Sequence, residues 1–263
     1  MISDLPPPRY ERLTSAPLEL VVWQMQFAEP ARVSAPAVGA QVAEALRADG
    51  QGSFNLSRLV PPQIAIGLGP GLPPQAPVEP DGWQLRRGQL VVNVGSGSVS
   101  AETTAYDTWE GFRATIAALC SVLGELDDVP GEQRMGLRYV DRVAVPGVQQ
   151  ASDWNGLLAS WLTAPLAQPQ LADAVLATAG QLELRVDEEL QAAVRHRLFP
   201  DFERRGRQTV ILDYDTFRQG YRPFNAEAAL EAVDRCSDVA HRLFEASLTP
   251  DLYKMFMRDT ESD

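Results

Sequence analysis

The residues best suited to chemistry are two arginines on one predicted strand. In the strand predicted from Arg134 to Val145, side chains alternate between two faces, so Arg138 and Arg142 share one face. Two guanidinium groups placed in this way can clamp a carboxylate or a phosphate through planar, bidentate hydrogen bonds. The alternative is that they pair with acidic groups of the chain itself, such as Asp107 and Asp215. We favour this structural interpretation, in which the arginines anchor two strand-to-helix corners.

Two aspartates on a second predicted strand form the next candidate. Asp213 and Asp215 share a face at the predicted strand end, a spacing compatible with a metal ion or with acid-base catalysis. No further ligands stand at a recognisable spacing, so a strand terminus and a helix cap are favoured. The two histidines, His196 and His241, belong to no motif with a nucleophile, and no glycine-rich nucleotide-binding motif occurs. The sequence predicts no metal and no cofactor, and it leaves catalytic activity open while favouring a non-enzymatic protein.

A third candidate is a pair of tryptophans between the two halves of the chain. Trp154 and Trp161 fall on the apolar stripe of a helix predicted from Trp154 to Leu166. The stripe is expected to belong to the core. The alternative is an exposed anchor for a partner, because aromatic residues are enriched at interfaces.

The tripeptide Tyr-Asp-Thr occurs twice, and its surroundings organise these candidates. It stands at residues 106–108 and 214–216, each time followed by an aromatic residue and placed between strand-like and helix-like sequence. Asp107 can cap the following helix, with Glu110 completing a capping box. We therefore predict one architectural unit used twice, in halves of about 17–146 and 152–258, with each tripeptide at a corner between a strand and a helix.

The elements that would position these residues are short strands grouped ahead of helices. Glycine and proline punctuation separates them, and a proline-rich segment at 61–80 is predicted to be a surface loop with a short strand at 64–68. Strands are predicted at residues 18–27, 83–87, 89–94, 98–104, 134–145, 174–186, 190–199 and 207–213. Helices are predicted at 36–48, after Asp107, at 154–166, after a cap at Asn225, and from Thr249 to about Met257.

Meanders followed by helices predict an α+β fold, in which two long helices cover one face of antiparallel sheet. The 263 residues are expected to form a single domain, because 45% hydrophobic residues suffice for a large core. The two cysteines, Cys120 and Cys236, are expected to be buried free thiols of a reducing compartment. With no leader or membrane-spanning run apparent, a cytoplasmic protein is expected. The net charge of −12 opposes binding to nucleic acid or to anionic lipid.

Several segments together resemble a known family. The strongest is Gly136-Leu-Arg-Tyr-Val-Asp-Arg-Val143, supported by Ala16-Pro-Leu-Glu19 and by Tyr106-Asp-Thr-Trp-Glu-Gly-Phe112. This chain resembles a sporadically distributed bacterial family of about this length that has no assigned reaction, substrate or cofactor. The resemblance spans most of the chain, and it departs from the family pattern at Asp141, where asparagine is usual. The sporadic distribution implies a subunit of a multi-protein bacterial system of the mobile-island or defence type.

Taken together, these observations predict a non-enzymatic interaction or assembly protein that recognises another protein, or a second copy of itself, through a sheet surface. The alternative is a ligand-binding or enzymatic domain with a pocket between the two halves. A deep pocket with converging side chains would favour that alternative. The candidate binding residues are Arg138, Arg142, Tyr139, Asp107, Asp215, Trp154 and Trp161.

Overall fold

The computed structural model describes residues 2, 5–9, 11–33, 35–59, 81–126, 129–202 and 207–257. Over these residues, nine strands form one antiparallel sheet in the order β2-β3-β4-β5-β1-β6-β9-β8-β7. The strands are β1 (Leu18–Phe27), β2 (Asn55–Leu59), β3 (Gly82–Arg87), β4 (Leu90–Gly95), β5 (Ser98–Thr103), β6 (Glu132–Val143), β7 (Thr178–Arg185), β8 (Leu190–Asp201) and β9 (Arg207–Arg222). The predicted α+β class with antiparallel sheet is therefore confirmed. The short strand predicted at 64–68 lies outside the described residues.

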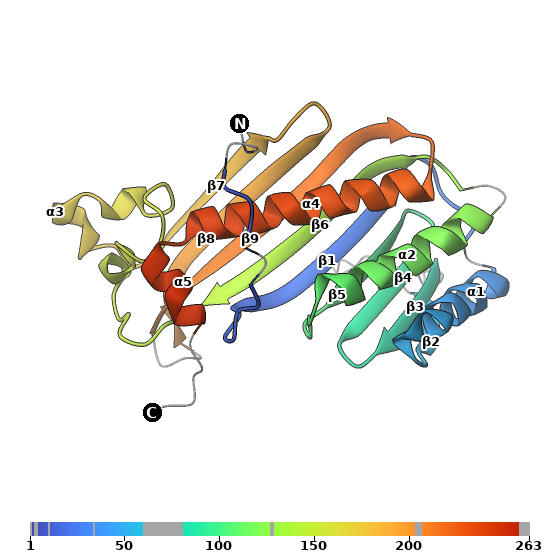
Figure 1. The fold of residues 1–263 in the computed structure, drawn as a ribbon, viewed down its shortest axis with the longest axis horizontal. Helices are drawn as coiled ribbons and strands as arrows, with labels where there is room; N and C mark the ends of the chain where they lie inside the picture. Colours follow the sequence, from blue (N-terminus) through green and yellow to red (C-terminus); the bar gives the residue numbers. More distant parts are fainter. Residues whose placement is uncertain are drawn as a thin grey trace, which may run out of the picture.

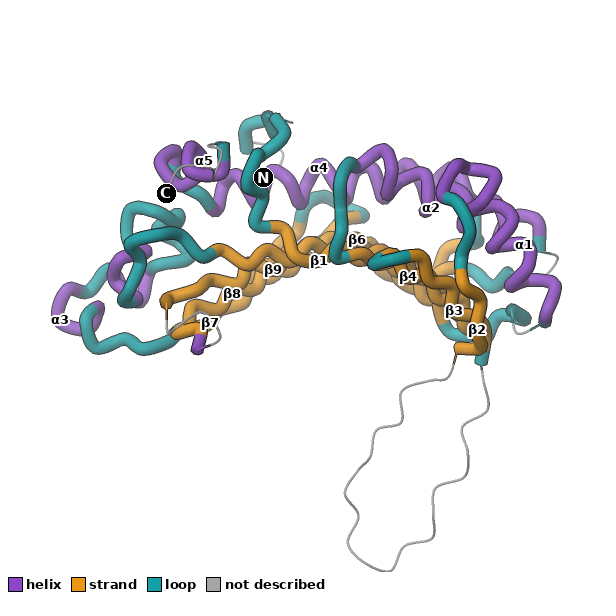
Figure 2. The backbone as a smooth tube through the Cα atoms, turned by 90° about the horizontal axis from the view of Figure 1, so that it is seen from below, coloured by secondary structure: helices purple, strands orange, loops and turns teal. Residues whose placement is uncertain are grey.

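Apart from the short α3, which lies beyond the end of the sheet, the helices lie on one face of this sheet (Figure 1). They are α1 (Pro36–Leu46), α2 (Trp109–Glu125), α3 (Pro169–Ala172), α4 (Ala226–Ser247) and α5 (Pro250–Phe256). Seen edge-on, the sheet is arched, α1, α2 and α4 follow its convex side, and no described helix crosses the concave side (Figure 2). Each of the two larger helices buries an apolar stripe, and α4 packs on β9 and β6. Among the described residues, no helix is both long and apolar enough to cross a membrane.

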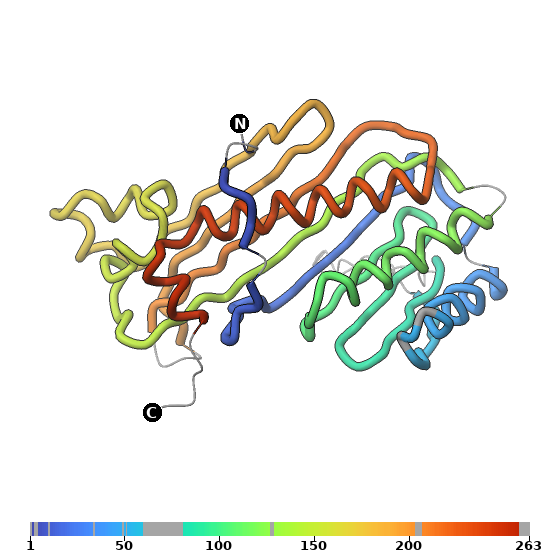
Figure 3. The backbone as a smooth tube through the Cα atoms, viewed as in Figure 1, coloured from blue at the N-terminus to red at the C-terminus, as the bar shows by residue number. Residues whose placement is uncertain are grey.

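The two central strands begin similar runs of elements. β1 is followed by α1, by the meander β2-β3-β4-β5 and by helix α2. β6, beside β1, is followed by two 3₁₀ turns and the short α3, and then by the meander β7-β8-β9 and helix α4. The colouring along the chain in Figure 3 shows the two runs on opposite sides of the central pair. A shared order of elements does not establish a common origin, so the internal duplication stays a prediction.

The two Tyr-Asp-Thr tripeptides do not occupy equivalent positions. The first follows β5, and the N-cap of α2 is Thr108, whose hydroxyl accepts a hydrogen bond from the Gly111 N–H at 3.2 Å. The second lies in the middle of β9, which runs nine residues past the predicted end at Asp213. The predicted second corner and the capping role of Asp107 are therefore wrong. Tyr214, Thr216 and Phe217 are residue types that favour strands, and Asp215 lies on the face of the sheet away from the helices.

The predicted helix from Trp154 to Leu166 is also wrong. The chain makes single 3₁₀ turns at Ala151–Trp154 and Ala164–Leu166, with irregular structure between them. Gly156 has a left-handed φ of 85°, which breaks the helical path immediately after the first turn. Two predictions at the other end of the chain are confirmed: Asn225 caps α4, and Thr249 caps α5 with proline at its start. The apolar residues of this segment, such as Trp154, Leu158 and Leu162, are buried at helical spacing although the segment is not a helix.

Candidate functional site

The described helices leave the concave side of the sheet uncovered (Figure 2). We call it the open face. Register and alternation place on it the residues opposite one another across neighbouring strands, for example Gln24 with Ser100 and Gly136, and Arg138 with Val22 and Asp215. The other set of side chains, such as Trp23, Leu137 and Tyr214, is buried beneath the helices. The sheet therefore separates a core face from a face available for binding.

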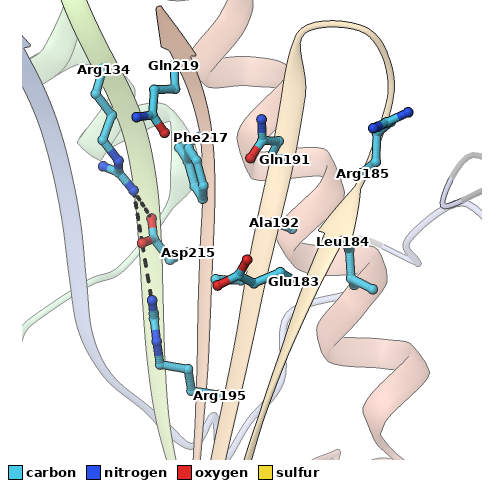
Figure 4. A pocket seen from close by; sticks show the side chains of 11 residues that line it. Arg134, Glu183, Leu184, Arg185, Gln191, Ala192, Arg195, Asp215, Phe217 and Gln219 are labelled. Atoms are coloured by element: carbon cyan, nitrogen blue, oxygen red, sulfur yellow. Dashed lines mark hydrogen bonds and ion pairs between the residues drawn. The ribbon is translucent and has the colours of Figure 1, made fainter.

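Arginines and aspartates form a connected network on this open face. Arg138 holds Asp213 with two hydrogen bonds, Nε to Oδ1 at 2.7 Å and Nη2 to Oδ2 at 2.8 Å. Arg134 holds Asp215 through Nη2, at 2.9 Å to each carboxylate oxygen. Arg195 lies between the two carboxylates, with Nη1 3.7 Å from Asp213 and 3.9 Å from Asp215. Figure 4 shows Arg134 and Arg195 reaching Asp215 from opposite sides.

This network supports the structural interpretation of the two predicted arginines, with different partners. The hydrogen bonds that Arg138 donates to Asp213 raise the pKa of this guanidinium. Arg142 pairs with Glu19 at 3.1 Å and with the buried Asp201 at 2.8 Å. Neither predicted partner, Asp107 nor Asp215, is bonded to these arginines. Strand register decides the outcome: Asp213 of β9 lies diagonally opposite Arg138, whereas the partners of Arg142 come from β1 and β8.

Asp107 lies far from the open face in the arrangement of the fold. It follows β5 on the helix-covered side and forms an exposed ion pair with Arg12, Nη2 to Oδ1 at 2.7 Å. Arg12 belongs to the N-terminal arm, the described residues that precede β1. The four residues that would line a pocket between the halves, Arg138, Arg142, Asp107 and Asp215, thus do not converge. Only Asp215 lines the pocket described next.

A shallow pocket of about 550 Å³ opens beside the network, over β6, β9, β8 and β7. Phe217 and Ala193 contribute its apolar lining, and Arg134 stacks its guanidinium 4.3 Å from the centre of the Phe217 ring. Figure 4 shows Gln191, Gln219 and Asp215 near the Phe217 ring. The other lining residues are Glu183, Leu184, Arg185, Gln191, Ala192, Arg195, Asp215 and Gln219. The pocket offers both charges, amide groups and one aromatic surface, a combination suited to a polar side chain.

Tyr139 belongs to a different environment, on the helix-covered face. Its hydroxyl lies 3.2 Å from the Ser237 hydroxyl of α4, and its ring contacts those of Tyr106 and His241. Burial raises the pKa of Tyr139 well above its usual range and lowers the pKa of His241. Tyr139 is therefore a packing residue between the sheet and α4, and it has no access to the open face.

The two tryptophans are separated by their burial. Trp154 is fully buried, whereas Trp161 is 37% exposed and donates its indole N–H to the Ala246 carbonyl at 3.4 Å. The structure thus assigns Trp154 to the core. It leaves Trp161 as a half-exposed residue beside the end of α4, and the two do not form a common anchor.

Metal and thiol chemistry find no geometric support in the described part of the chain. No group of three or more histidine, cysteine, aspartate or glutamate side chains comes together there as a metal site would require. Cys120 and Cys236 are free and buried, as predicted, and burial raises the pKa of each thiol to about 12. Neither cysteine is suited to act as a nucleophile.

Sequence reasoning missed the residues that complete the open face. Sequence patterns assign no role to Arg134, Glu183 or Arg195, and they mark Phe217 only as the aromatic residue that follows the second Tyr-Asp-Thr. The usable signal was the alternation in β8 and β9, where every second residue belongs to one face. Extending β9 past Asp213 would have placed Phe217 beside Arg134. Comparison of the chain with protein-family models and with curated proteins finds no match.

Proposed function

We propose that the protein is a non-enzymatic interaction protein that binds another protein on the open face of its sheet. The observation that carries this proposal is the one-sided architecture: the described helices pack against one face, and the opposite face presents an ordered polar network. Sheets usually bury at least one face, and a second ordered face in solvent is available for recognition.

The open face is large enough for a protein partner. Nine strands at a spacing of about 4.8 Å extend roughly 38 Å across the sheet, and strands of six residues extend about 20 Å along it. A stable interface buries about 800 Å² on each partner. The concave shape suits a rounded or helical surface rather than a flat one.

The composition of this face also resembles that of protein interfaces. Its centre holds the half-buried apolar residues Leu20, Val22 and Val140, with Leu20 directly opposite Val140 across the strand pair. Arg138 and the arginine network border this centre. Interfaces typically combine an apolar centre with a polar rim, and arginine and aromatic residues are enriched among the groups that dominate binding energy.

The pocket provides an anchoring point within this surface. A partner side chain that enters it would contact Phe217 and exchange hydrogen bonds with Gln191 and Gln219, which line the pocket. The alternative of a ligand-binding or enzymatic domain loses its expected site, since its residues are spread over both faces. A role as one subunit of a multi-protein bacterial system, which the family resemblance implies, fits the proposed binding surface.

The experiment compares capture of host proteins by the tagged wild-type chain and by matched variants. Val22→Arg and Phe217→Ala alter the open face, whereas Leu171→Arg alters an exposed residue of α3 and serves as control. We expect one protein to be recovered stoichiometrically by wild type and control, and to be lost at least tenfold with both open-face variants. Recovery that is equal for all variants refutes the proposal, and a tightly retained metabolite without a protein supports the ligand-binding alternative.

A further inference from the structure

The outer edge of β7 carries a row of backbone groups that β8 does not use. The Val186 N–H donates to the Leu190 carbonyl at 3.0 Å, which fixes the phase of the β7–β8 ladder. Inward and outward groups alternate along an antiparallel strand, so Leu184 and Leu182 direct their N–H and C=O toward β8. Ala179, Gln181, Glu183 and Arg185 direct theirs to the edge.

The edge strand β7 contains no proline, lysine or bulge, although it carries the charged Glu183 and Arg185. Proteins blunt edges with prolines, lysines, bulges or very short strands. β7 has eight residues, Thr-Ala-Gly-Gln-Leu-Glu-Leu-Arg, and pairs with β8 without any shift of register. Among the described elements, only β8 packs extensively against it. The opposite edge, β2, has five residues and is the shortest strand of the sheet.

We propose that β7 pairs antiparallel with β7 of a second copy of this chain, across a twofold axis at Leu182. In this register Gln181 lies opposite the partner's Glu183, and Ala179 opposite the partner's Arg185. All four are residues with edge-directed backbone groups, so each pair closes hydrogen bonds in both directions. The same surface of each copy takes part, as a closed twofold dimer requires.

The side chains at the edge are self-complementary in this register. On the open face, the Gln181 amide can donate to the partner's Glu183, as it already donates to Glu183 of its own chain at 3.0 Å. On the other face, Leu182 is 40% exposed and would be covered by the partner's Leu182. Moving the axis to Glu183 would place like charges directly opposite, which is destabilising. Charge and apolar pattern therefore favour the axis at Leu182.

The dimer has a geometric consequence for the open face. Pairing at the edge joins two sheets into one continuous sheet, and both open faces then lie on the same side. Glu183 and Arg185 line the pocket and belong to β7, so the two pockets would adjoin the twofold axis. The inference rests on the edge alone, and it stands whether or not a different protein binds the open face.

Cysteine cross-linking tests the proposed axis. At the edge, Leu182 would form a non-hydrogen-bonded pair with its symmetry mate, with Cα atoms about 4.5 Å apart. That distance allows a disulfide, and the native cysteines are buried. We expect Leu182→Cys to form a reducible dimer under mild oxidation, of twice the 28.8 kDa chain mass. The control Leu56→Cys, on β2 and with a similar exposure of 42%, is expected to stay uncross-linked.

A proline substitution tests the backbone pairing in the unmodified chain. Gln181→Pro removes an edge-directed N–H and leaves the ladder to β8 intact, and Gln181→Ala keeps that N–H as matched control. In light scattering over a concentration series, we expect wild type and Gln181→Ala to be dimers and Gln181→Pro to be a monomer. Circular dichroism verifies that the proline variant is folded, and if it is not, the cross-linking pair decides.

Three results would overturn the inference. One is a wild-type chain that stays monomeric throughout the series. Another is equal cross-linking of Leu182→Cys and Leu56→Cys, which indicates random collision. The third is a folded Gln181→Pro variant that remains dimeric, since the dimer would then use another surface. Failure of the dimeric wild-type chain to capture any partner would instead count against the proposed function only.

Discussion

At the scale of single residues, Asp141 is the most unusual group of the fold. It lies on β6 beneath the helices, only 4% exposed, between Tyr139 and Val143 on the core face. Burial raises the pKa of this carboxyl to about 8. Asparagine has nearly the same shape as aspartate and carries no charge, so it fits this site, whereas the aspartate adds a dependence on pH.

We predict that Asp141→Asn stabilises the protein at pH 8 and not at pH 4. Between the unfolded pKa near 3.8 and the folded pKa near 8, the folded chain holds a proton that the unfolded chain has released. Raising the pH through this window therefore lowers the free energy of unfolding, by up to about 1.4 kcal/mol per pH unit. The variant lacks this slope. Urea titrations of both proteins between pH 4 and 8 measure it, and parallel pH profiles would contradict the raised pKa.

At the scale of elements, one buried ion pair joins two strands to a helix. Arg218 of β9 holds Glu132 of β6 through two hydrogen bonds, at 2.5 and 2.7 Å, and also donates to the Ala228 carbonyl in α4 at 3.2 Å. The side chains are only 9% and 2% exposed. A buried pair of this kind fixes relative placement more than it adds stability, because desolvation offsets the attraction.

We predict that Arg218→Met lowers the free energy of unfolding by about 3–5 kcal/mol, because it leaves the Glu132 carboxylate buried without its partner. The double variant Glu132→Leu with Arg218→Met should recover most of that loss, since it removes the uncompensated charge. Chemical denaturation of the two variants and the wild type gives the comparison. A double variant that is less stable than Arg218→Met alone would show that the pair contributes more than its charge balance.

Two neighbouring residues at the start of α2 have different roles, and the sequence pattern assigned the helix cap to the wrong one. Thr108 is the cap, whereas Asp107 forms an exposed pair with Arg12. We predict that Thr108→Ala costs about 1 kcal/mol of stability, while Asp107→Ala changes it by less, since exposed ion pairs contribute about 0–1 kcal/mol. Thermal denaturation of both variants tests the order. The reverse order would restore the predicted aspartate cap.

The fold class was predictable because local signals were consistent over most elements. β1 begins and ends at the predicted residues, and α4 and α5 begin at the predicted caps. Errors arose where packing overrode a pattern. Trp154 lies in a 3₁₀ turn, its side chain is buried, and Gly156 prevents the turn from continuing as a helix. The spacing of apolar residues alone cannot distinguish such a buried turn from a buried helix. β9 continues because its two aspartates lie on the open face, where arginines of neighbouring strands neutralise them.

The candidate site was predicted only in part. Alternation correctly placed Arg138 and Arg142 on one face and identified internal acids as their partners. It could not identify which acids, because pairing between β6 and β9 depends on register across 75 residues of sequence. The pocket was beyond prediction for the same reason, since its lining comes from four strands that sequence alone did not arrange.

At the scale of the whole molecule, the N-terminal arm fastens the helical layer. Arg242 of α4 donates to the Leu5 carbonyl at 2.8 Å, and Arg9 lies 4.2 Å from the centre of the Tyr253 ring in α5. The Ser15 N–H donates to the Phe256 carbonyl at 3.0 Å. The arm runs across α4 before it enters β1 (Figure 1). It therefore links α4, α5 and the central strand, although it contributes no strand itself.

We predict that removing residues 1–13 loosens α5 while the sheet remains folded. The truncation deletes the Arg9 contacts with Tyr253 and with Glu245, and it exposes apolar surface under Leu5 and Leu13. Amide hydrogen exchange should then increase at Pro250–Phe256 and stay unchanged in β6 and β9.

Arg9→Ala should reproduce part of the effect, because a cation–π contact contributes about 0.5–1 kcal/mol. Arg47→Ala, which removes a local pair with Glu44 on the exposed surface, is the control and should leave α5 unchanged. If α5 keeps its protection from hydrogen exchange in the truncated chain, contacts with α4 alone hold the helix in place, and the arm does not stabilise it.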